Sequence, residues 1–244
     1  MKILFIAGYG HVGSTILEYY LNKHPEIFAL GESKHLKYSQ NKLCSCKKKL
    51  NKCSFWKRFI KKNYYILEGF VDHEITRIKY ILRIISINFE KKKTNPYKKI
   101  NVYLKKKNIK YLVDNSKDPL ALIDCIKKNK KKQVVVIFLR KEILKVIKSY
   151  NNKNRIINKL DIKNPLTTFF EYFLNNFLIK IILKIYNLNY LEIENRELKK
   201  NPIKTIEKIF NFLQIKYRSF NIKKKIKNEY HSLEGNSLRF NLKN

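Results

Sequence analysis

The sequence predicts an α/β domain of three layers, in which helices flank a mainly parallel central sheet. Four short runs of β-branched, aliphatic or aromatic residues alternate with helical patterns, and this alternation is typical of parallel sheets. The chain has 244 residues, 44% of them hydrophobic, which suffices for the core of one sizeable domain and excludes a disordered or fibrous chain. The predicted strands are Lys2–Ala7, Tyr111–Asp114, Val134–Leu139 and Tyr190–Ile193.

The first predicted strand is followed directly by a glycine-rich loop, Gly8 to Thr15, and then by the helix-compatible run Ile16–Lys23. His24-Pro25 ends that run, because the residue before a proline avoids the helical region. A strand, a glycine loop and a helix in this order bind phosphate through backbone amides and the helix N-terminus. The alternative for this segment alone is a glycine turn without a ligand.

The loop lacks one residue of the nucleoside-triphosphate motif G-x-x-x-x-G-K-[ST]. Ser14 occupies the position of the lysine, which normally reaches the β- and γ-phosphates. The replacement argues against ATP or GTP hydrolysis. A donor with a single 5′-phosphate and a sulfonate needs no such bridge.

The pattern changes between Cys44 and Asn108, where we predict a helical insertion beside the sheet. This segment begins with cysteines and lysines and continues through an Ile/Leu-rich helical stretch, Glu74–Phe89. It closes in a lysine-rich loop that contains Asn95-Pro96. We assign residues 1–244 to a single domain and 44–108 to an insertion that lines the acceptor side of the site.

Two more helices are predicted in the C-terminal half. Phe169 to Tyr186 carries five polar residues at the spacing of an amphipathic helix, so we expect no membrane span. Asn201-Pro202 supplies a cap and a proline at the first helical position. The apolar run at the N-terminus is too short for a signal peptide, so we expect a cytoplasmic protein with reduced cysteines. The apolar positions expected to be buried after Pro202 are Ile206, Ile209, Phe210 and Leu213.

The formal net charge of +35 raises the question of a nucleic-acid ligand. The excess is nearly all lysine, is spread over the whole chain, and accompanies many asparagines and isoleucines. These three residues share A/T-rich codons, so genome composition explains the bias. We therefore favour a solvated surface over a selected polyanion-binding surface and expect no specific nucleic-acid partner. The charge still attracts anionic ligands.

Three cysteines near the start of the insertion, Cys44, Cys46 and Cys53, offer three thiolates to a metal. The sequence shows no well-spaced fourth ligand, so we predict no metal site and favour a packed or redox-sensitive cluster over zinc. Cys125 follows Pro119 on a predicted helix, and we expect it in the core.

Six motifs in the chain resemble, in the same order, those of the sulfotransferase superfamily, in particular its bacterial and carbohydrate-directed members. Together they span nearly the whole sequence. In the N-terminal half, the family patterns R-S-G-S-T-L-L, H-P and G-E resemble Gly10 to Leu17, His24-Pro25 and Gly31-Glu32; C-x-C-G…C-P-F-W resembles Cys44-Ser45-Cys46, Cys53 and Phe55-Trp56; and V-D-S-S-K resembles Val113 to Lys117. In the C-terminal half, the 3′-phosphate segment L-V-R-D-P-R-A-V-x-x-S resembles Phe138-Leu139-Arg140 with Ser149, and Y-E-D-L…D-P resembles Glu194-Asn195 with Asn201-Pro202. The last pattern, G-N-P-x-R-F, resembles His231, Gly235-Asn236 and Arg239-Phe240.

The resemblance implies a P-loop-like fold and transfer of a sulfonate from 3′-phosphoadenosine 5′-phosphosulfate (PAPS) to a hydroxyl of a carbohydrate or glycoconjugate, without a metal. The loop residues would hold the 5′-phosphate and sulfonate, and the residues after the second predicted strand would bind the donor or an acceptor anion. The C-terminal motif would close over the nucleotide. The implied donor-binding residues are Gly10, Val12, Gly13, Ser14, Thr15, Ser116, Lys117, Arg140, Ser149, Gly235, Asn236 and Arg239.

Two residues are candidates for catalysis. His11 stands where relatives commonly have Lys or Arg, and its protonated ring can stabilise the leaving phosphate, although it can also be a loop residue only. Glu32 is the candidate general base, or alternatively a cap for a helix that begins near Ser33. The 3′-phosphate segment departs from the family spacing of eight residues, because Arg140 precedes Ser149 by nine and Lys141 by eight. Either cation can therefore serve.

Two other functions remain open. A kinase-like phosphotransferase would use the same loop, and the missing lysine speaks against it. A non-catalytic relative would bind polyanions or nucleic acid without turnover, and the net charge supports it. Competition by adenosine 3′,5′-bisphosphate but not by ATP would favour the sulfotransferase.

Overall fold

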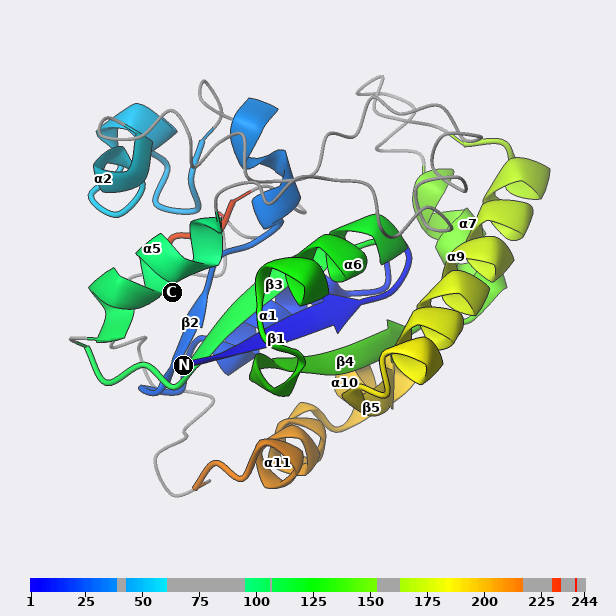
Figure 1. Ribbon diagram of the computed structural model, residues 1–244. Coiled ribbons are helices and arrows are strands. Elements are labelled where there is room, and N and C mark those ends of the chain that lie inside the picture. Colours follow the sequence, from blue (N-terminus) through cyan, green and yellow to red (C-terminus); the bar gives the residue numbers. More distant parts are fainter. Residues whose placement is uncertain are drawn as a thin grey trace.

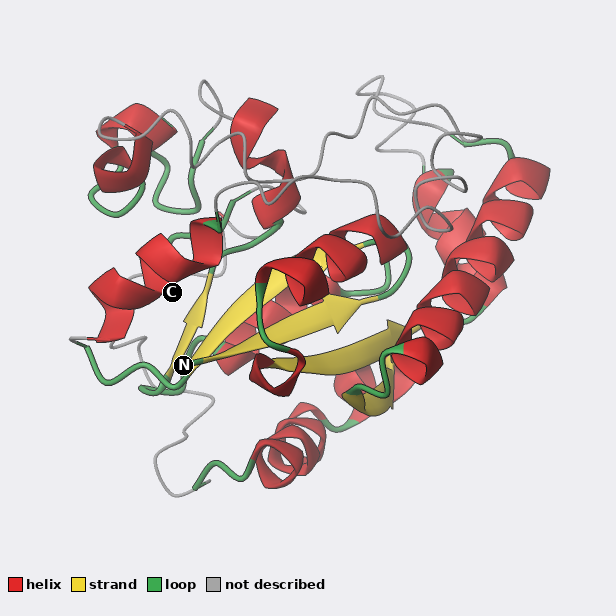
Figure 2. Ribbon diagram, viewed as in Figure 1, coloured by secondary structure: helices red, strands yellow, loops and turns green. Residues whose placement is uncertain are grey.

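The computed structural model describes residues 1–38, 43–60, 95–105, 107–152, 163–216, 230–233 and 240. Its centre is a five-stranded sheet with the strand order β2-β3-β1-β4-β5, and all four strand pairs are parallel. Helices cover both faces of this sheet, which confirms the predicted three-layer α/β architecture (Figures 1 and 2). The strands are β1 (Lys2–Ala7), β2 (Ile27–Ala29), β3 (Tyr111–Lys117), β4 (Val134–Arg140) and β5 (Asn189–Glu194).

The four predicted strands are all present, and a fifth strand was not predicted. That strand, β2, has only three residues and follows the turn at His24-Pro25. It pairs with β3, with Phe28 opposite Leu112. A strand of three residues is too short to show a recognisable hydrophobic pattern, so β2 is identified only by its pairing with β3.

Alternation along the central strand decides which helices pack on which face. Ile3 and Phe5 point into the core cluster under α5, α6 and α9, whereas Leu4 and Ile6 point into the cluster under α1 and α11. The predicted apolar positions of α11 are all buried there. The helices are α1 (Ser14–Leu21), α2 (Lys57–Ile60), α5 (Pro96–Lys105), α6 (Pro119–Lys128), α7 (Ile143–Tyr150), α9 (Pro165–Ile185), α10 (Asn195–Lys200) and α11 (Pro202–Leu213), with 3₁₀ turns at Ser33–Tyr38, Leu50–Lys52 and Lys131–Gln133.

The predicted insertion is described only in part, because Glu74–Phe89 lies outside the described residues. The prediction of a loop around Asn95-Pro96 was wrong, since α5 begins there. The side chain of Asn95 accepts a hydrogen bond from the backbone amide of Lys98 (3.1 Å), and proline suits the first helical position. The cap and the buried, helically spaced Tyr97, Ile100 and Leu104 stabilise the helix.

Within the described part of the chain, α9 is the one helix long and apolar enough to cross a membrane, and a third of its most apolar window is buried. Tyr172 and Ile179 pack on the protein, whereas Phe170, Phe173 and Phe177 are exposed. Core helices of soluble proteins pass the same length and composition test. The expectation that this helix does not span a membrane therefore stays a prediction.

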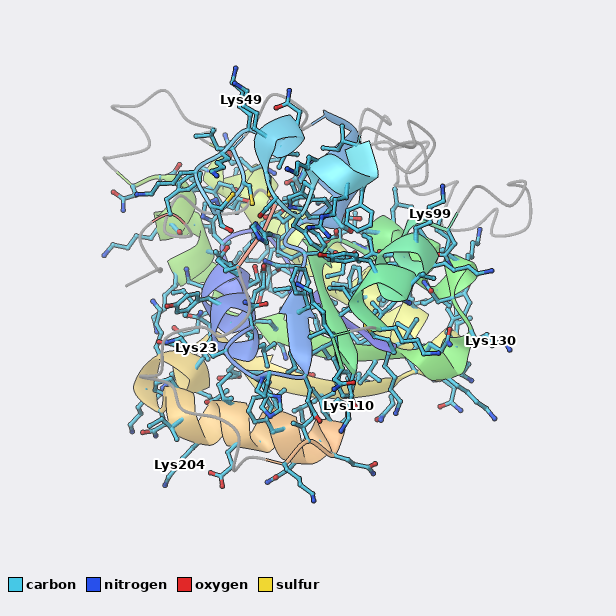
Figure 3. The ribbon with its side chains drawn as sticks, turned by 90° about the vertical axis from the view of Figure 1, so that its left-hand side faces the viewer. Lys23, Lys49, Lys99, Lys110, Lys130 and Lys204 are labelled. Carbon is cyan, nitrogen blue, oxygen red and sulfur yellow. The ribbon has the colours of Figure 1, made fainter. Side chains whose placement is uncertain are left out.

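The positive charge is spread over several sides of the molecule. Figure 3 shows Lys49 at the top of the view, Lys99 of α5 at the right and Lys204 of α11 at the lower left, each pointing away from the ribbon. This distribution agrees with a solvated lysine-rich surface more than with a single strip of charge.

One carboxyl group is buried in α1. Glu18 has no exposed surface and accepts a hydrogen bond from Asn115 (2.8 Å). Burial raises the pKa of Glu18 to about 7 from 4.5, although the hydrogen bond from Asn115 and the charge of Lys117 oppose the shift. Between pH 4.5 and about pH 7, Glu18 is therefore protonated in the folded chain and ionised in the unfolded chain.

We expect stability to decrease with pH because of Glu18. The contribution of the protonated carboxyl is fully present below about pH 4.5 and is lost as the pH rises through about 7, which amounts to about 3 kcal/mol. Glu18→Gln should remove this part of the pH dependence, whereas Glu207→Gln on the exposed side of α11 should not. Urea unfolding of the three proteins at pH 5 and pH 8 measures the difference. Parallel pH dependence in wild type and Glu18→Gln would show that Glu18 is ionised in the fold.

Candidate functional site

The carboxyl ends of the five strands meet at one edge of the sheet, as expected for parallel strands. The residues that follow the strands are therefore neighbours, and most of the predicted site residues are among them. They are the glycine loop after β1, Glu32 after β2, Lys117 at the end of β3, Arg140 and Lys141 at the end of β4, and Asn195 after β5.

Side chains from neighbouring elements bind the carbonyl groups of the loop. The Lys141 ammonium donates to the carbonyl of His11 (3.1 Å), and the buried Asn195 amide donates to the carbonyl of Val12 (2.7 Å). Carbonyl oxygens repel anions, and these two are engaged by donors. Val12 is buried, so a role in donor binding could involve only its backbone.

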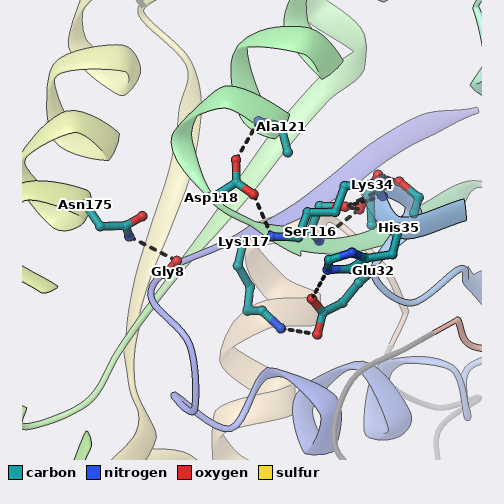
Figure 4. A network of polar contacts seen from close by, with 11 residues as sticks. Gly8, Glu32, Lys34, His35, Ser116, Lys117, Asp118, Ala121 and Asn175 are labelled. Carbon is teal, nitrogen blue, oxygen red and sulfur yellow. Dashed lines mark hydrogen bonds and ion pairs between the residues drawn. The ribbon is translucent and has the colours of Figure 1, made fainter. Parts of the chain in front are cut away.

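Helix α9 fixes the start of the loop. Its Asn175 donates to the carbonyl of Gly8 (3.1 Å; Figure 4), and its Glu171 accepts a hydrogen bond from the Tyr9 hydroxyl (2.7 Å). Lys163 forms an ion pair with the same carboxylate (2.7 Å). Burial, followed by the hydrogen bond to Glu171, raises the pKa of Tyr9 far above its usual value, so the phenol stays a neutral donor.

The loop passes into α1 through Gly13, which has φ 93° and is the N-terminal cap residue. A Cβ atom there would lie 2.2 Å from the Asn195 side-chain nitrogen, and one at Gly10 would lie 2.1 Å from the Tyr150 hydroxyl. In the part of the chain that the structure describes, the backbone amides of Gly13 and Ser14 have no acceptor. Unpaired amides at a helix N-terminus form an anion-binding site. Ser14 and Thr15 place their hydroxyls in the first turn of this helix.

The structure brings two predicted residues together above the loop. His11 has φ 62°, and its Nδ1 lies 3.3 Å from the hydroxyl of Ser149 on α7. Its ring also contacts the Tyr150 ring edge to face, with centroids 4.2 Å apart. Ser149 and Tyr150 therefore fix the orientation of the imidazole next to the anion site.

The two candidate cations at the end of β4 have different surroundings. The Arg140 guanidinium pairs with Glu192 of β5 (2.5 Å), whereas Lys141 reaches the loop carbonyl. Burial and the nearby charges of Lys199 and Lys145 lower the pKa of Lys141. Both cations line a cavity of about 470 Å³, whose other lining residues are Glu142, Ile143, Lys145, Tyr172, Phe173, Glu194, Asn195, Arg196, Lys199 and Lys200. This cavity is predominantly basic and adjoins the loop.

On the other side of the loop, Glu32 is held by two basic side chains (Figure 4). It forms an ion pair with Lys117, and His35 Nε2 lies 3.4 Å from its second oxygen. Although burial opposes ionisation, the charge of Lys117 and the hydrogen bond from His35 hold the pKa of Glu32 well below its usual range. Lys117 has φ 68°, and its carbonyl accepts from the Gly8 amide (3.0 Å), so this strained residue joins β3 to the loop.

Ser116 belongs to a buried network beneath the site. Its hydroxyl donates to Asp114 (2.6 Å) and accepts from the Lys34 amide (3.1 Å). Asp114 also accepts from Ser33 and from the Tyr97 hydroxyl (2.5 Å). Burial raises the pKa of Asp114 in spite of these hydrogen bonds. The network fixes the end of β3, and binding of the donor by Ser116 stays a prediction.

Three predicted residues, Gly235, Asn236 and Arg239, lie outside the described residues. Several residues that hold the loop were not predicted as site residues, namely Asn175, Asn195 and Tyr150. Asn195 could have been found from its position two residues after the predicted strand Tyr190–Ile193. Asn175 and Tyr150 lie in helices and have no such signal.

Comparisons with known proteins were made with the sequence and with the structure. No protein-family model matches the chain, and no curated protein matches it. The sulfotransferase domain from the curacin biosynthetic pathway aligns with 99% of this chain and 82% of its own, with a TM-score of 0.56 and 16% identity.

Two other solved structures are similar. The sulfotransferase domain from the Synechococcus PCC 7002 olefin synthase aligns with 91% of this chain and 77% of its own (TM-score 0.54, 20% identity). A sulfotransferase from Alicyclobacillus acidocaldarius aligns with 93% and 87% (TM-score 0.53, 10% identity). At these identities the likeness is one of fold, and the chain has the sulfotransferase fold that its motifs predicted.

Proposed function

We propose that this protein is a sulfotransferase that moves the sulfonate of PAPS to a hydroxyl group. The observation that carries the proposal is a glycine loop that has anion-binding amides but lacks the lysine needed to bridge β- and γ-phosphates. The amides of Gly13 and Ser14 and the N-terminus of α1 bind the 5′-phosphate and the sulfonate. The basic cavity at Arg140 and Lys141 binds the 3′-phosphate.

The reaction is an in-line displacement at sulfur. The acceptor oxygen forms a bond to sulfur while the bond from sulfur to the bridging phosphate oxygen breaks, and adenosine 3′,5′-bisphosphate leaves with the electron pair. A protonated His11 stabilises the charge that grows on that oxygen. The Ser149 hydroxyl, 3.3 Å from Nδ1, helps to orient the ring.

Glu32 accepts the proton of the acceptor hydroxyl. A carboxylate held by Lys117 is a weak base, because its pKa lies well below the usual range. Arrival of the doubly anionic phosphosulfate end of the donor next to Lys117 draws the ammonium away from Glu32 and makes the carboxylate more basic. The ion pair thereby couples proton removal to the presence of the donor.

The proposed acceptor is a carbohydrate or glycoconjugate. Its support is the sequence resemblance around Gly31-Glu32, together with the place of Glu32 on the side of the sheet where the insertion lies. The surface charge would also support a non-catalytic polyanion-binding protein, but the lysines in Figure 3 point to several sides.

Donor binding is tested by calorimetric titration with adenosine 3′,5′-bisphosphate at moderate salt. We expect Lys141→Ala to weaken binding by about tenfold or more, because a hydrogen bond to a charged group contributes about 1.5–3 kcal/mol. Lys130→Ala is the matched control, since Lys130 is exposed and precedes β4 at the opposite edge of the sheet. Arg140→Ala shows whether this cation shares the role.

ATP should not compete with the bisphosphate. Binding of ATP or of a polyanion by a protein that ignores adenosine 3′,5′-bisphosphate would exclude the sulfotransferase and support one of the two other functions.

The role of His11 predicts a pH dependence of turnover. Histidine loses its proton within the neutral range, so release of bisphosphate from PAPS should slow as the pH rises through that range. In the protein without donor, the pKa of Glu32 lies well below this range, so the carboxylate is ionised throughout it. His11→Lys should flatten the profile, and His11→Ala should reduce kcat by about 100-fold or more. The assay uses a mixture of oligosaccharides as acceptors. Identical profiles for wild type and His11→Lys would assign His11 to the loop structure alone.

A further inference from the structure

Four metal-binding side chains converge outside the proposed donor site. Cys44, Cys46 and Cys53 come from the segment before α2, and His231 comes from the far end of the chain. One ligand atom from each lies within 4.8 Å of the other three. Nδ1 of His231 is 3.7 Å from the Cys44 sulfur and 3.3 Å from the Cys53 sulfur. The sequence analysis missed this fourth ligand because 178 residues separate His231 from Cys53.

These separations fit the coordination of zinc. A tetrahedral zinc ion with Zn–S of about 2.3 Å and Zn–N of about 2.0 Å sets its ligand atoms roughly 3.5–3.8 Å apart. Cys44 and Cys53 are fully buried, His231 is 4% exposed and Cys46 is partly buried, so most of the cluster is shielded from bulk water. Four protein ligands complete a closed site, which is the arrangement of structural zinc and leaves no position for a substrate.

Tight backbone turns fix the positions of the cysteines. A tight turn follows Cys44, in which Lys47 has φ 63° and donates to the Cys44 carbonyl (2.8 Å). The backbone amide of Cys44 donates to the Lys48 carbonyl (2.9 Å), and the amide of Cys53 donates to the Leu50 carbonyl (3.2 Å). These two turns hold the cysteine side chains next to one another.

The imidazole is oriented by three contacts. Its Nδ1 faces the sulfur atoms, while Nε2 lies 3.4 Å from the Ser54 hydroxyl. The ring stacks on Phe55 with an interplanar angle of 10° and a centroid distance of 5.7 Å. The backbone carbonyl of His231 accepts from the Trp56 indole (2.7 Å). A partner on the second ring nitrogen is typical of metal-bound histidine.

We propose that Cys44, Cys46, Cys53 and His231 bind one structural zinc ion. This site replaces the expectation of a packed or redox-sensitive cysteine cluster without a metal. The lysines at 47, 48 and 49 are exposed next to it and offset the single negative charge of a complex with three thiolates.

The ion joins the C-terminal segment to the edge of the sheet. Leu233 donates to the Leu30 carbonyl and accepts from the Glu32 amide, both at 2.8 Å. The Ser45 hydroxyl donates to the Tyr230 carbonyl (2.6 Å), which ties the cysteine turn to the same segment. Zinc therefore links the cysteine turn to the segment at 230–233, whose Leu233 contacts Glu32. This segment is red in Figure 1.

The metal content of the full chain tests the site. Protein produced with zinc in the medium and purified under reducing conditions, without a chelator or a histidine tag, should carry one zinc per chain by elemental analysis. Cys46→Ser should lose most of it, and this cysteine is chosen because it is only partly buried. Cys125→Ser is the matched control, since Cys125 is buried on α6 outside the cluster and should leave the zinc content unchanged.

Cobalt substitution of the wild-type protein provides a readout that does not depend on a variant folding. Cobalt in this site should give the intense visible bands of tetrahedral coordination and a thiolate-to-metal charge-transfer band. Zinc content near zero in the wild type, or a cobalt spectrum without these bands, would overturn the proposal. Equal zinc in wild type and Cys46→Ser would also overturn it. None of these results depends on donor binding.

Discussion

An anion can bind the loop after β1 only if the attraction of the loop amides exceeds the repulsion of the loop carbonyl oxygens. A stretch of backbone offers both, and a carbonyl oxygen facing a phosphate cancels the attraction of an amide. Here Lys141, Asn175 and Asn195 each donate to one loop carbonyl. The three donors come from the end of β4, from α9 and from α10, so the site depends on how these elements pack around β1. The long helix α9 therefore contributes to the site, because Asn175 on its inner face binds the loop carbonyl of Gly8.

The strand order separates the charges around that loop. With the order β2-β3-β1-β4-β5, the Glu32–Lys117 pair lies on the β2 side and the cavity at Lys141 lies on the β4 side. The two anionic ends of the donor would bind at the loop after β1 and at the cavity after β4. The hydroxyl acceptor would bind on the β2 side, next to the Glu32 carboxylate. The Cys/His cluster also lies on the β2 side, where Leu233 pairs with Gly31. The proposed zinc therefore supports the acceptor half of the site, while the loop serves the donor half.

Sequence patterns predicted the parts of this protein that depend on neighbours along the chain. The strand at Lys2–Ala7 and the glycine loop followed from local residue types, and α11 followed from Pro202 and its apolar spacing. The predicted cap was wrong, because the Asn201 side chain makes no cap hydrogen bond. Contacts between distant segments were not predictable in this way. Strand β2 is defined by pairing with β3, and His231 meets Cys53 only because the C-terminal segment returns to the sheet edge. The helix at Asn95-Pro96 begins with the same Asn-Pro pair as α11, and lysines among its apolar positions obscured the pattern.

Phosphorus NMR of adenosine 3′,5′-bisphosphate tests most directly whether the loop and the basic cavity bind the two ends of one ligand. Each phosphate gives its own resonance, so the two halves of the donor site report separately. We expect the wild-type protein to shift both resonances. Lys141→Ala should lose the shift of the 3′-phosphate and reduce that of the 5′-phosphate, because Lys141 also binds the His11 carbonyl. If the wild-type protein leaves both resonances in place while it shifts those of ATP, the loop serves a different nucleotide and the account of the donor site is wrong.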